Sequence, residues 1–310
     1  MILPYLAKWY VNAKFLGKHR PLQTVLFISD ECNLRCKHCY VYSREKPVVK
    51  SYEQIRDDLQ YSYNLGSRFV DFEGGEPMIW HDGEKNINDL IALAKEIGFF
   101  STTITTNAQL PLNECKAHSI WVSMDGVGEY HEMIRGKGTW AKLEKNIAES
   151  HHPALSVNMT INTLNYTNVE AAIEYAKRNP AILSISLNFH KPPAGSEFVE
   201  GDTKRTIPED GLFLDMERRN DVIDKIIAMK KAKYPIMNSV SGLKLMKTLD
   251  FKKCCWVCNY ILPDGTRLPE CVGSRAGMCA KCGFCMAGEM RSVMNFKLDT
   301  LMAGMRLRVD

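Results

Sequence analysis

The sequence predicts an α/β fold, namely a partial (β/α)6 TIM barrel followed by a small cysteine-rich extension. Two observations carry this prediction. Six short apolar runs have the composition of buried strands, and segments with the apolar spacing of helices lie between most of them. The chain has 310 residues, which is enough for one barrel domain and an appendage. Because there are about six strand–helix units rather than eight, we expect the barrel not to close.

Residues 1–22 form the first predicted element, a basic amphipathic helix. Apolar residues fall near helical spacing over residues 3–20, and lysine and arginine side chains give the segment a positive charge. Such a helix either covers the open end of a barrel, which we favour, or lies on a membrane surface. Peripheral membrane contact through residues 3–20 therefore stays an alternative.

Strands and helices then alternate through the predicted barrel domain, residues 23–206. The expected strands span residues 24–29, 68–72, 100–105, 120–123, 155–161 and 182–188. The expected helices span residues 52–65, 85–97, 139–150 and 169–178, and Ser51 with Gln54 predicts a capping box at the start of the first. This alternation is typical of βαβ units with a parallel sheet. We expect the catalytic and ligand-binding residues at the carboxyl ends of the strands.

Three cysteines, Cys32, Cys36 and Cys39, follow the first strand within eight residues. Thiolates are the ligands that iron–sulfur clusters take, and three of them leave the fourth iron of a cubic cluster open to a small molecule. A structural zinc site is the alternative, although such a site normally has four ligands and favours cysteines in CxxC pairs.

Glycines and small polar residues follow the later strands. The second strand ends in Glu73-Gly74-Gly75-Glu76-Pro77, where paired glycines allow the backbone to approach a ligand closely. Candidate binding residues at the ends of the third to sixth strands are Thr106, Asn107, Ser123, Asp125, Arg135, Asn158 and His190.

The CxxxCxxC spacing of the three cysteines and the Gly-Gly-Glu-Pro stretch about 35 residues later together resemble the radical S-adenosylmethionine (SAM) superfamily. The resemblance implies a 4Fe–4S cluster whose fourth iron holds the amino and carboxylate groups of SAM. It also implies reductive cleavage of SAM to a 5′-deoxyadenosyl radical that abstracts hydrogen from the substrate. A reducing partner such as flavodoxin or ferredoxin would supply the electron.

The same resemblance implies roles for individual residues. The stretch from Gly74 to Pro77 would contact the SAM amino group, and Ser123 and Asp125 would bond the ribose. Arg135 would support the SAM carboxylate or pack on the Asp125 loop. The residues expected to bind SAM are His38, Gly74, Gly75, Glu76, Pro77, Thr106, Asn107, Ser123, Asp125, Arg135 and Asn158.

Residues 207–310 form the predicted extension, with helices near residues 208–233 and 239–249 after a long loop over residues 191–206. Seven of the 11 cysteines lie within 32 residues, at positions 254, 255, 258, 271, 279, 282 and 285. In an intracellular chain such density indicates metal binding more than disulfides. A tight Asp-Gly turn between two short strands separates Cys258 from Cys271.

This arrangement resembles, in part, the SPASM/twitch extension that holds auxiliary 4Fe–4S clusters. We expect one auxiliary cluster, with Cys258, Cys271, Cys282 and Cys285 as its ligands. A zinc ribbon would need the same thiols. Cys115 stands apart and is expected to be structural.

Charge and hydropathy exclude other classes of function. The formal net charge of +4 is too small to indicate nucleic acid as a partner. The apolar stretch at residues 1–6 is short, Lys8 interrupts it soon afterwards, and no apolar run is long enough to span a bilayer. We therefore expect a cytoplasmic protein.

The substrate is the least determined part of the prediction. There is no segment of the size of a separate peptide-recognition domain, which favours a small-molecule substrate over a peptide. The layout is similar to that of hopanoid-modifying enzymes, so a lipid or isoprenoid substrate is an alternative, as is a peptide. The alternative of another class is a non-catalytic iron–sulfur electron carrier or zinc-binding module, which has no use for an open iron and a SAM pocket.

Overall fold

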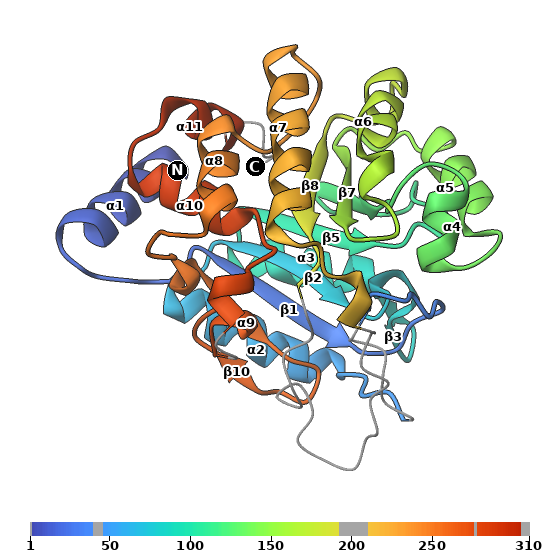
Figure 1. Ribbon diagram of the computed structural model, residues 1–310. Helices are drawn as coiled ribbons and strands as arrows, with labels where there is room; N and C mark the ends of the chain where they lie inside the picture. The colour runs from blue at the N-terminus through green and yellow to red at the C-terminus, as the bar shows by residue number, and fades with distance from the viewer. Residues whose placement is uncertain (1, 40–45, 192–209, 276–277, 305–310) are drawn as a thin grey trace.

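A computed structural model describes residues 2–39, 46–191, 210–275 and 278–304. The fold is the predicted one: a parallel sheet curves into a partial barrel with helices on its outside (Figure 1). Six parallel strands match the six predicted ones, namely β1 (Gln23–Ser29), β2 (Phe69–Gly74), β5 (Ser101–Thr106), β6 (Ser119–Ser123), β7 (Leu155–Ile161) and β8 (Ile185–Phe189). The loop predicted over residues 191–206 lies, apart from Lys191, outside the described residues.

The sheet has two more strands than the sequence indicated for the barrel. Its order is β10-β9-β1-β2-β5-β6-β7-β8, and among the described residues the edge strands β10 and β8 do not pair with each other. β9 (Cys258–Ile261) runs parallel to β1, and β10 (Arg267–Leu268) returns antiparallel to β9. The predicted Asp-Gly hairpin therefore extends the barrel sheet instead of belonging only to an appendage.

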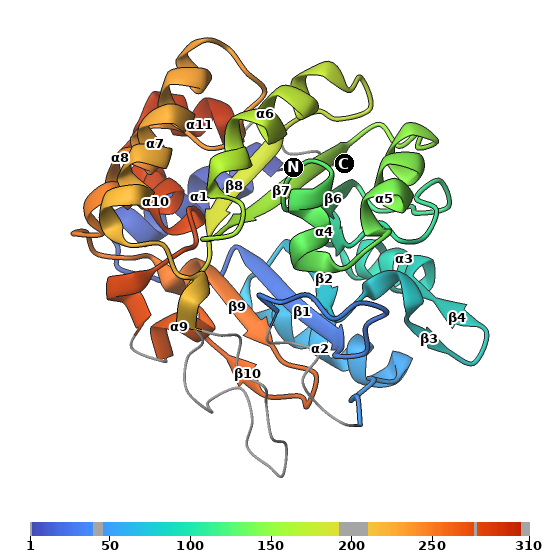
Figure 2. The same ribbon diagram turned by 45° about the vertical axis from the view of Figure 1, so that its right-hand side comes forward.

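An outer layer of helices covers the parallel strands (Figure 2). It comprises α2 (Tyr52–Leu65), α3 (Ile87–Ile97), α5 (Thr139–Ala148) and α6 (Val169–Arg178). The short helix α4 (Glu129–Arg135) instead lies beside the cysteine loop, where the Ile134 carbonyl accepts a hydrogen bond from the Lys37 N–H. The capping box predicted at Ser51 and Gln54 is present. The helix predicted from residue 85 begins at Ile87, because Lys85–Asn86 (β4) pairs with His81–Asp82 (β3) and the Asn86 side chain caps the helix. Short 3-10 turns span Pro77–Ile79, Tyr166–Asn168 and Asp210–Leu212.

The C-terminal part is mostly helical. Its helices are α7 (Met216–Lys231), α8 (Val240–Thr248), α9 (Val272–Arg275), α10 (Met286–Met294) and α11 (Leu298–Gly304), with 3-10 turns at Cys255–Val257 and Met278–Lys281. α7 is shorter than predicted because Asp215 caps it by accepting a hydrogen bond from the Arg218 N–H. The main hydrophobic core contains residues from both predicted domains, for example Leu26 and Leu243, each fully buried.

α1 (Ile2–Phe15) lies at the end of the sheet from which the strands begin. The Tyr5 hydroxyl donates to the Gly66 carbonyl just before β2, and the Tyr5 ring packs edge-on against Phe100 just before β5. Trp9 and Ala13 are buried in a second core cluster with Cys254, Val257 and Met294. In the described part of the chain, no helix has the length and hydropathy needed to cross a membrane.

Candidate functional site

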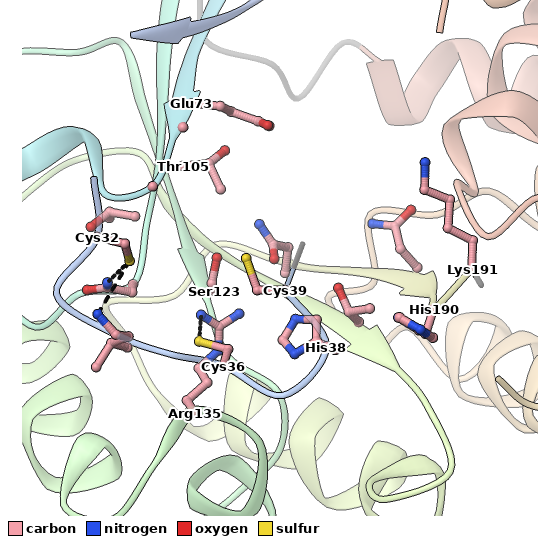
Figure 3. Close-up of a pocket in the computed structure, with 18 of the residues that line it drawn as sticks. Cys32, Cys36, His38, Cys39, Glu73, Thr105, Ser123, Arg135, His190 and Lys191 are labelled. Atoms are coloured by element: carbon pink, nitrogen blue, oxygen red, sulfur yellow. Dashed lines mark hydrogen bonds between the residues drawn. The ribbon is translucent and has the colours of Figure 1, made fainter. Parts of the chain in front are cut away.

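A pocket of about 300 Å³ lies at the carboxyl ends of the parallel strands, where the sequence predicted chemistry (Figure 3). Eleven of the predicted site residues line it, namely Cys32, Cys36, His38, Cys39, Gly74, Gly75, Thr106, Asn107, Ser123, Arg135 and Asn158. His190 lines it as well. Glu76, Pro77 and Asp125 are buried behind its wall. The fold therefore brings together one loop and the ends of five strands.

The paired glycines fix the position of the cysteine loop. A Cβ atom on Gly74 would lie 2.1 Å from the Ser29 carbonyl oxygen, and one on Gly75 would lie 1.8 Å from that of Glu31. The N–H of Gly75 donates to the Ser29 carbonyl at 2.8 Å. Side chains are excluded here because the turn packs directly on the backbone that enters the cysteine loop. From the sequence, the expected reason for these glycines was that a ligand would approach the backbone closely. Contact of Gly74 and Gly75 with a ligand stays a prediction.

Glu76 braces the end of the next strand. Its carboxylate accepts hydrogen bonds from Thr106 Oγ1 and from the Asn107 N–H, both at 2.7 Å, and from the Met78 N–H at 3.0 Å. Asn107 in turn donates through Nδ2 to Asn33 Oδ1 at 2.7 Å, inside the cysteine loop. Both carboxylate oxygens of Glu76 are thus bonded within the protein, and the residue positions the pocket wall.

Asp125 and Arg135 form a buried ion pair next to the cysteines. Arg135 Nε lies 2.7 Å from Asp125 Oδ2, His38 Nε2 lies 3.6 Å from the same oxygen, and Asp125 Oδ1 accepts from the Thr160 N–H. Burial alone would raise the pKa of Asp125, but the Arg135 guanidinium and His38 hold it below its ordinary value. Of the two roles expected for Arg135, the structure shows the packing on Asp125.

The three cysteines of the loop are suited to a cluster. Burial raises the pKa of Cys36 to about 12, and Arg135 Nη1 lies 3.9 Å from its Sγ. A bound metal deprotonates such a thiol outright. Among the residues with described positions, no three His, Cys, Asp or Glu side chains are arranged to hold a metal ion between them. In a cubic cluster each thiolate binds a different iron, so its ligands need not converge on one point.

Two carboxyl groups at the back of the pocket had no predicted role. Asp71 and Glu73 alternate along β2 and share a hydrogen bond, and Thr105 Oγ1 lies 3.3 Å from Asp71 Oδ1. Burial raises the pKa of Glu73 to about 7 and that of Asp71 above its ordinary value. In Figure 3 the side chains of Glu73 and Thr105 point to the same side of the sheet, into the pocket. The signal in the sequence was the pair of acids two residues apart on a strand, which share a face.

The C-terminal cysteines group differently from the predicted ligand set. The Cys255 thiol donates to Cys271 and lowers the pKa of Cys271 to about 6. Cys279 and Cys282 both act electrostatically on Cys255. Of the predicted set, Cys271 and Cys282 belong to this group. The group thus includes Cys255 and Cys279, which the sequence did not select.

The other two predicted ligands lie at the edges of this group. Cys258 begins β9, and its pKa is raised to about 12 by burial, with further effects from Cys271 and the Asp71–Glu73 pair. Cys285 is 1% exposed at the start of α10, and burial raises its pKa to about 12 as well. The predicted ligand roles of Cys258 and Cys285 are not tested by these positions.

A buried cation accompanies the C-terminal cysteines. Arg219 is 1% exposed, and its Nη1 donates to the Cys282 carbonyl at 2.7 Å. Its Nε and Nη2 have no hydrogen-bond partner in the described part of the structure. Buried donors of this kind are costly unless a further group satisfies them. An anionic group bound by the neighbouring thiolates would compensate this positive charge.

Comparison with known proteins gives one family. The model of the radical SAM superfamily matches residues 26–187, from β1 to β8. An Fe-coproporphyrin III synthase from Methanosarcina barkeri is 26% identical over 211 residues, which cover 63% of this chain and 50% of that enzyme. A GTP 3′,8-cyclase from Alkaliphilus oremlandii is 30% identical over 135 residues, or 39% of this chain and 41% of the other.

A maturation protein is also similar in sequence. The sporulation killing factor maturation protein SkfB of Bacillus subtilis is 27% identical over 174 residues, which cover 51% of this chain and 40% of SkfB. The chain thus spans about half the length of the curated relatives it matches.

Solved structures share the fold. SuiB of Streptococcus suis, bound to S-adenosylmethionine, superposes with a TM-score of 0.62 at 17% identity, over 97% of this chain and 71% of that one. The structure of native anSMEcpe with bound AdoMet gives a TM-score of 0.58 at 18% identity, over 80% of this chain and 74% of that one. At these identities the likeness is one of fold.

Proposed function

The chain belongs to the radical SAM superfamily, and from this premise we propose that it is an enzyme that cleaves SAM reductively in the pocket at the strand ends. Cys32, Cys36 and Cys39 would hold a 4Fe–4S cluster, with the fourth iron left for SAM. The observation that carries this proposal is the convergence of the three cysteines with the ends of five strands on one pocket. When bound, the cluster and SAM supply a 5′-deoxyadenosyl radical that removes a hydrogen atom from the substrate.

The protein's own part is orientation and the exclusion of water. Ser123 and Asn158 present polar side chains to the pocket from neighbouring strands, paired in register between β6 and β7. The Asp125–Arg135 ion pair holds the wall beside Cys36 and His38. The Glu76 network fixes the turn after β5 against the cysteine loop. These contacts support binding of SAM by His38, Gly74, Gly75, Thr106, Asn107, Ser123, Arg135 and Asn158.

We further propose one auxiliary 4Fe–4S cluster, held by Cys255, Cys271, Cys279 and Cys282. The grouping of these four thiols supports it, as does Arg219, whose two unsatisfied donors lie beside Cys282 and Cys285. This set replaces the one expected from the sequence, in which Cys258 and Cys285 stood in place of Cys255 and Cys279.

The substrate would enter the same pocket. Glu73 and Lys191, both lining residues, give the pocket an acidic and a basic side chain. We propose a small polar molecule as the substrate, with a lipid or isoprenoid as the alternative. A peptide is the second candidate, because SkfB, whose name describes maturation of a killing factor, is among the sequence relatives. A one-electron donor such as flavodoxin or ferredoxin would be the reducing partner.

The test is anaerobic reconstitution with iron and sulfide, followed by incubation with SAM and dithionite. The proposal predicts 5′-deoxyadenosine and methionine in equal amounts. A non-catalytic carrier would take up iron and yield neither product. GTP and short peptides, added separately, test the substrate classes, because a true substrate should accelerate formation of 5′-deoxyadenosine.

A further inference from the structure

The outward face of α1 is apolar, although the opposite face already supplies the helix with its buried contacts. Leu3, Ala7, Val11 and Phe15 recur every four residues and so follow one side of the helix. Leu3 is 80% exposed and Phe15 69%. Scattered exposed apolar residues are ordinary, whereas a continuous row along one helix marks an interaction surface.

The apolar row on α1 lies next to exposed apolar residues from the C-terminal part of the chain. The Tyr10 ring lies 5.2 Å from the Phe296 ring and 6.5 Å from the Phe15 ring, centroid to centroid. The Tyr10 hydroxyl also donates to the Met294 carbonyl. Phe296, between α10 and α11, is 63% exposed, and Leu298, the first residue of α11, is 73% exposed. Figure 1 shows α1, α10 and α11 together on the side of the molecule from which β1 starts. We call this row of residues, with Phe296 and Leu298, the apolar face.

Basic side chains flank the apolar face on both sides. A hollow of about 170 Å³ beside Ala13 has five basic side chains in its wall, namely Lys14, His19, Lys252, Lys253 and Arg291. A second hollow, beside Trp9, is lined by Lys8, Lys18 and Arg20 together with Asn12. Neither hollow has an acidic residue in its lining, and the first 29 residues of the chain contain no Asp or Glu. Since Lys8 and Lys14 lie on opposite borders of the row, the pattern is apolar in the middle and cationic at both edges.

We propose that α1 and the segment around Phe296 dock the protein onto the surface of an anionic lipid bilayer. The apolar face would enter the boundary between head groups and acyl chains, and the two basic hollows would take up lipid phosphates. Apolar side chains bordered by lysine and arginine, with Trp and Tyr nearby, are the features that interfacial helices use. An acidic protein would match the cations but not the apolar row. A second copy of the chain would place cations against cations.

Docking of this kind is separate from the proposed chemistry. α1 packs where the strands begin, whereas the cysteine pocket lies where they end. When the protein is docked on the bilayer through α1, its cysteine pocket would therefore lie at the end of the strands away from the membrane. Membrane binding would place the enzyme at a surface without taking part in SAM cleavage.

Co-sedimentation with vesicles tests this inference on the reconstituted protein. We expect binding to vesicles of phosphatidylcholine mixed with phosphatidylglycerol, little binding to phosphatidylcholine alone, and weaker binding at high salt. Lys8→Glu with Lys14→Glu should lower the partition coefficient at least about tenfold, since each change replaces a cation that attracts the anionic surface with an anion that it repels. Val11→Asp with Phe15→Asp should lower it by at least about as much.

Matched controls use similar side chains elsewhere. Lys142→Glu with Lys145→Glu changes two exposed lysines on α5, and Val49→Asp changes an exposed apolar residue at the other end of β1. Both should bind vesicles like the wild type, and all variants should retain 5′-deoxyadenosine formation, which shows that they are folded.

Several results would overturn the inference. One is sedimentation with neither kind of vesicle. Another is binding of inorganic phosphate in the hollows, measured by calorimetry, without vesicle binding. A third is a dimer in gel filtration that Val11→Asp with Phe15→Asp converts to monomer, again without vesicle binding. If the wild-type protein does not cleave SAM, the proposed function is wrong, but the result of the vesicle experiment still holds.

Discussion

The two cysteine-rich regions are built in different ways. Cys32, Cys36 and Cys39 all belong to one loop, whose entry is fixed by the Gly74–Gly75 turn. Cys255, Cys271, Cys279 and Cys282 come from separate turns that follow α8, β10 and α9. A site on one loop has a spacing that can be recognised in a sequence. A site assembled from several turns has a spacing that depends on how those turns pack.

The two regions also differ in how their buried arginines are paired. Arg135, beside Cys36, forms an ion pair with Asp125 at 2.7 Å. Arg219, beside Cys282 and Cys285, donates only through Nη1 among the contacts described, and its other nitrogens have no partner there. The first arginine thus belongs to a network of side-chain contacts, whereas the second stacks over the Phe189 ring and has two nitrogens without a hydrogen-bond partner among the described residues.

The largest expected effect is at the first region. Replacement of Cys32, Cys36 and Cys39 by Ala together should remove about four irons per chain and abolish 5′-deoxyadenosine formation, because no cluster remains to bind SAM. Iron and sulfide assays with product chromatography measure both. Cys115→Ala, which changes a buried cysteine in the core, should lose neither.

The second region should lose iron without losing SAM cleavage. Replacement of Cys255, Cys271, Cys279 and Cys282 by Ser should remove about four irons and leave the rest. Replacement of Cys258 and Cys285 by Ser should remove none. If the latter pair loses iron as completely as the former four, the ligand set expected from the sequence is the correct one. Uptake of zinc in place of iron would indicate a structural zinc ribbon.

Arg135→Leu should destabilise the cluster-free protein by about 3 kcal/mol, because Asp125 would be left buried without its counter-charge. Urea denaturation measures the difference. The double variant Arg135→Leu with Asp125→Asn should recover part of the loss. An equal loss in the double variant would mean that packing, rather than the charge pair, sets the cost.

The acid pair should make stability depend on pH. The pKa of Glu73 is about 7 in the folded chain against an ordinary value of 4.5. The folded state therefore binds more protons than the unfolded state between these values, and stability falls as pH rises through this window. The slope is at most about tenfold in the unfolding equilibrium per pH unit. Glu73→Gln should remove the contribution of Glu73 to this slope in urea titrations of the cluster-free protein.

Glu289 provides the control for that experiment, since burial also raises its pKa to about 7. Glu289→Gln should remove its own contribution and leave that of Glu73. If Glu73→Gln leaves the pH dependence unchanged, Glu73 does not hold a proton in the folded chain.

The smallest expected effect is at Arg219. Arg219→Gln should lower the midpoint potential of the auxiliary cluster by tens of millivolts, because loss of a nearby positive charge disfavours the reduced state. Redox titration followed by electron paramagnetic resonance measures this. The potential of the cluster on Cys32, Cys36 and Cys39 should not change.

Local patterns were enough to predict the barrel. Each parallel strand is a short apolar run, and features such as the Ser51–Gln54 capping box mark where helices begin. The pairing of β9 with β1 could not be predicted in this way, because no local pattern states which strand a distant segment will join. Residues 208 and 209, at the start of the helix predicted at residues 208–233, lie outside the described residues.

The site was predicted where residues share one loop or strand end. Cys32, Cys36 and Cys39 fall in one pocket because a short loop leaves them no alternative. Glu76 was assigned to SAM from its motif, yet its carboxylate oxygens are bonded to Thr106, Asn107 and Met78, which only the fold brings together. The grouping of Cys255 and Cys279 with Cys271 and Cys282 likewise depends on how separate turns pack.

The partnership of β9 with β1 has a consequence for the order in which the molecule is assembled. Gln23 and Cys258 are neighbours in the sheet but 235 residues apart in the chain. On a ribosome, β1 through β8 can pair with successive neighbours while this last partner is still unsynthesised, and closing so long a loop is a late event. The pocket of the first three cysteines can therefore form well before the second group exists. Iron–sulfur assembly would then proceed in sequence, with the N-terminal cluster first.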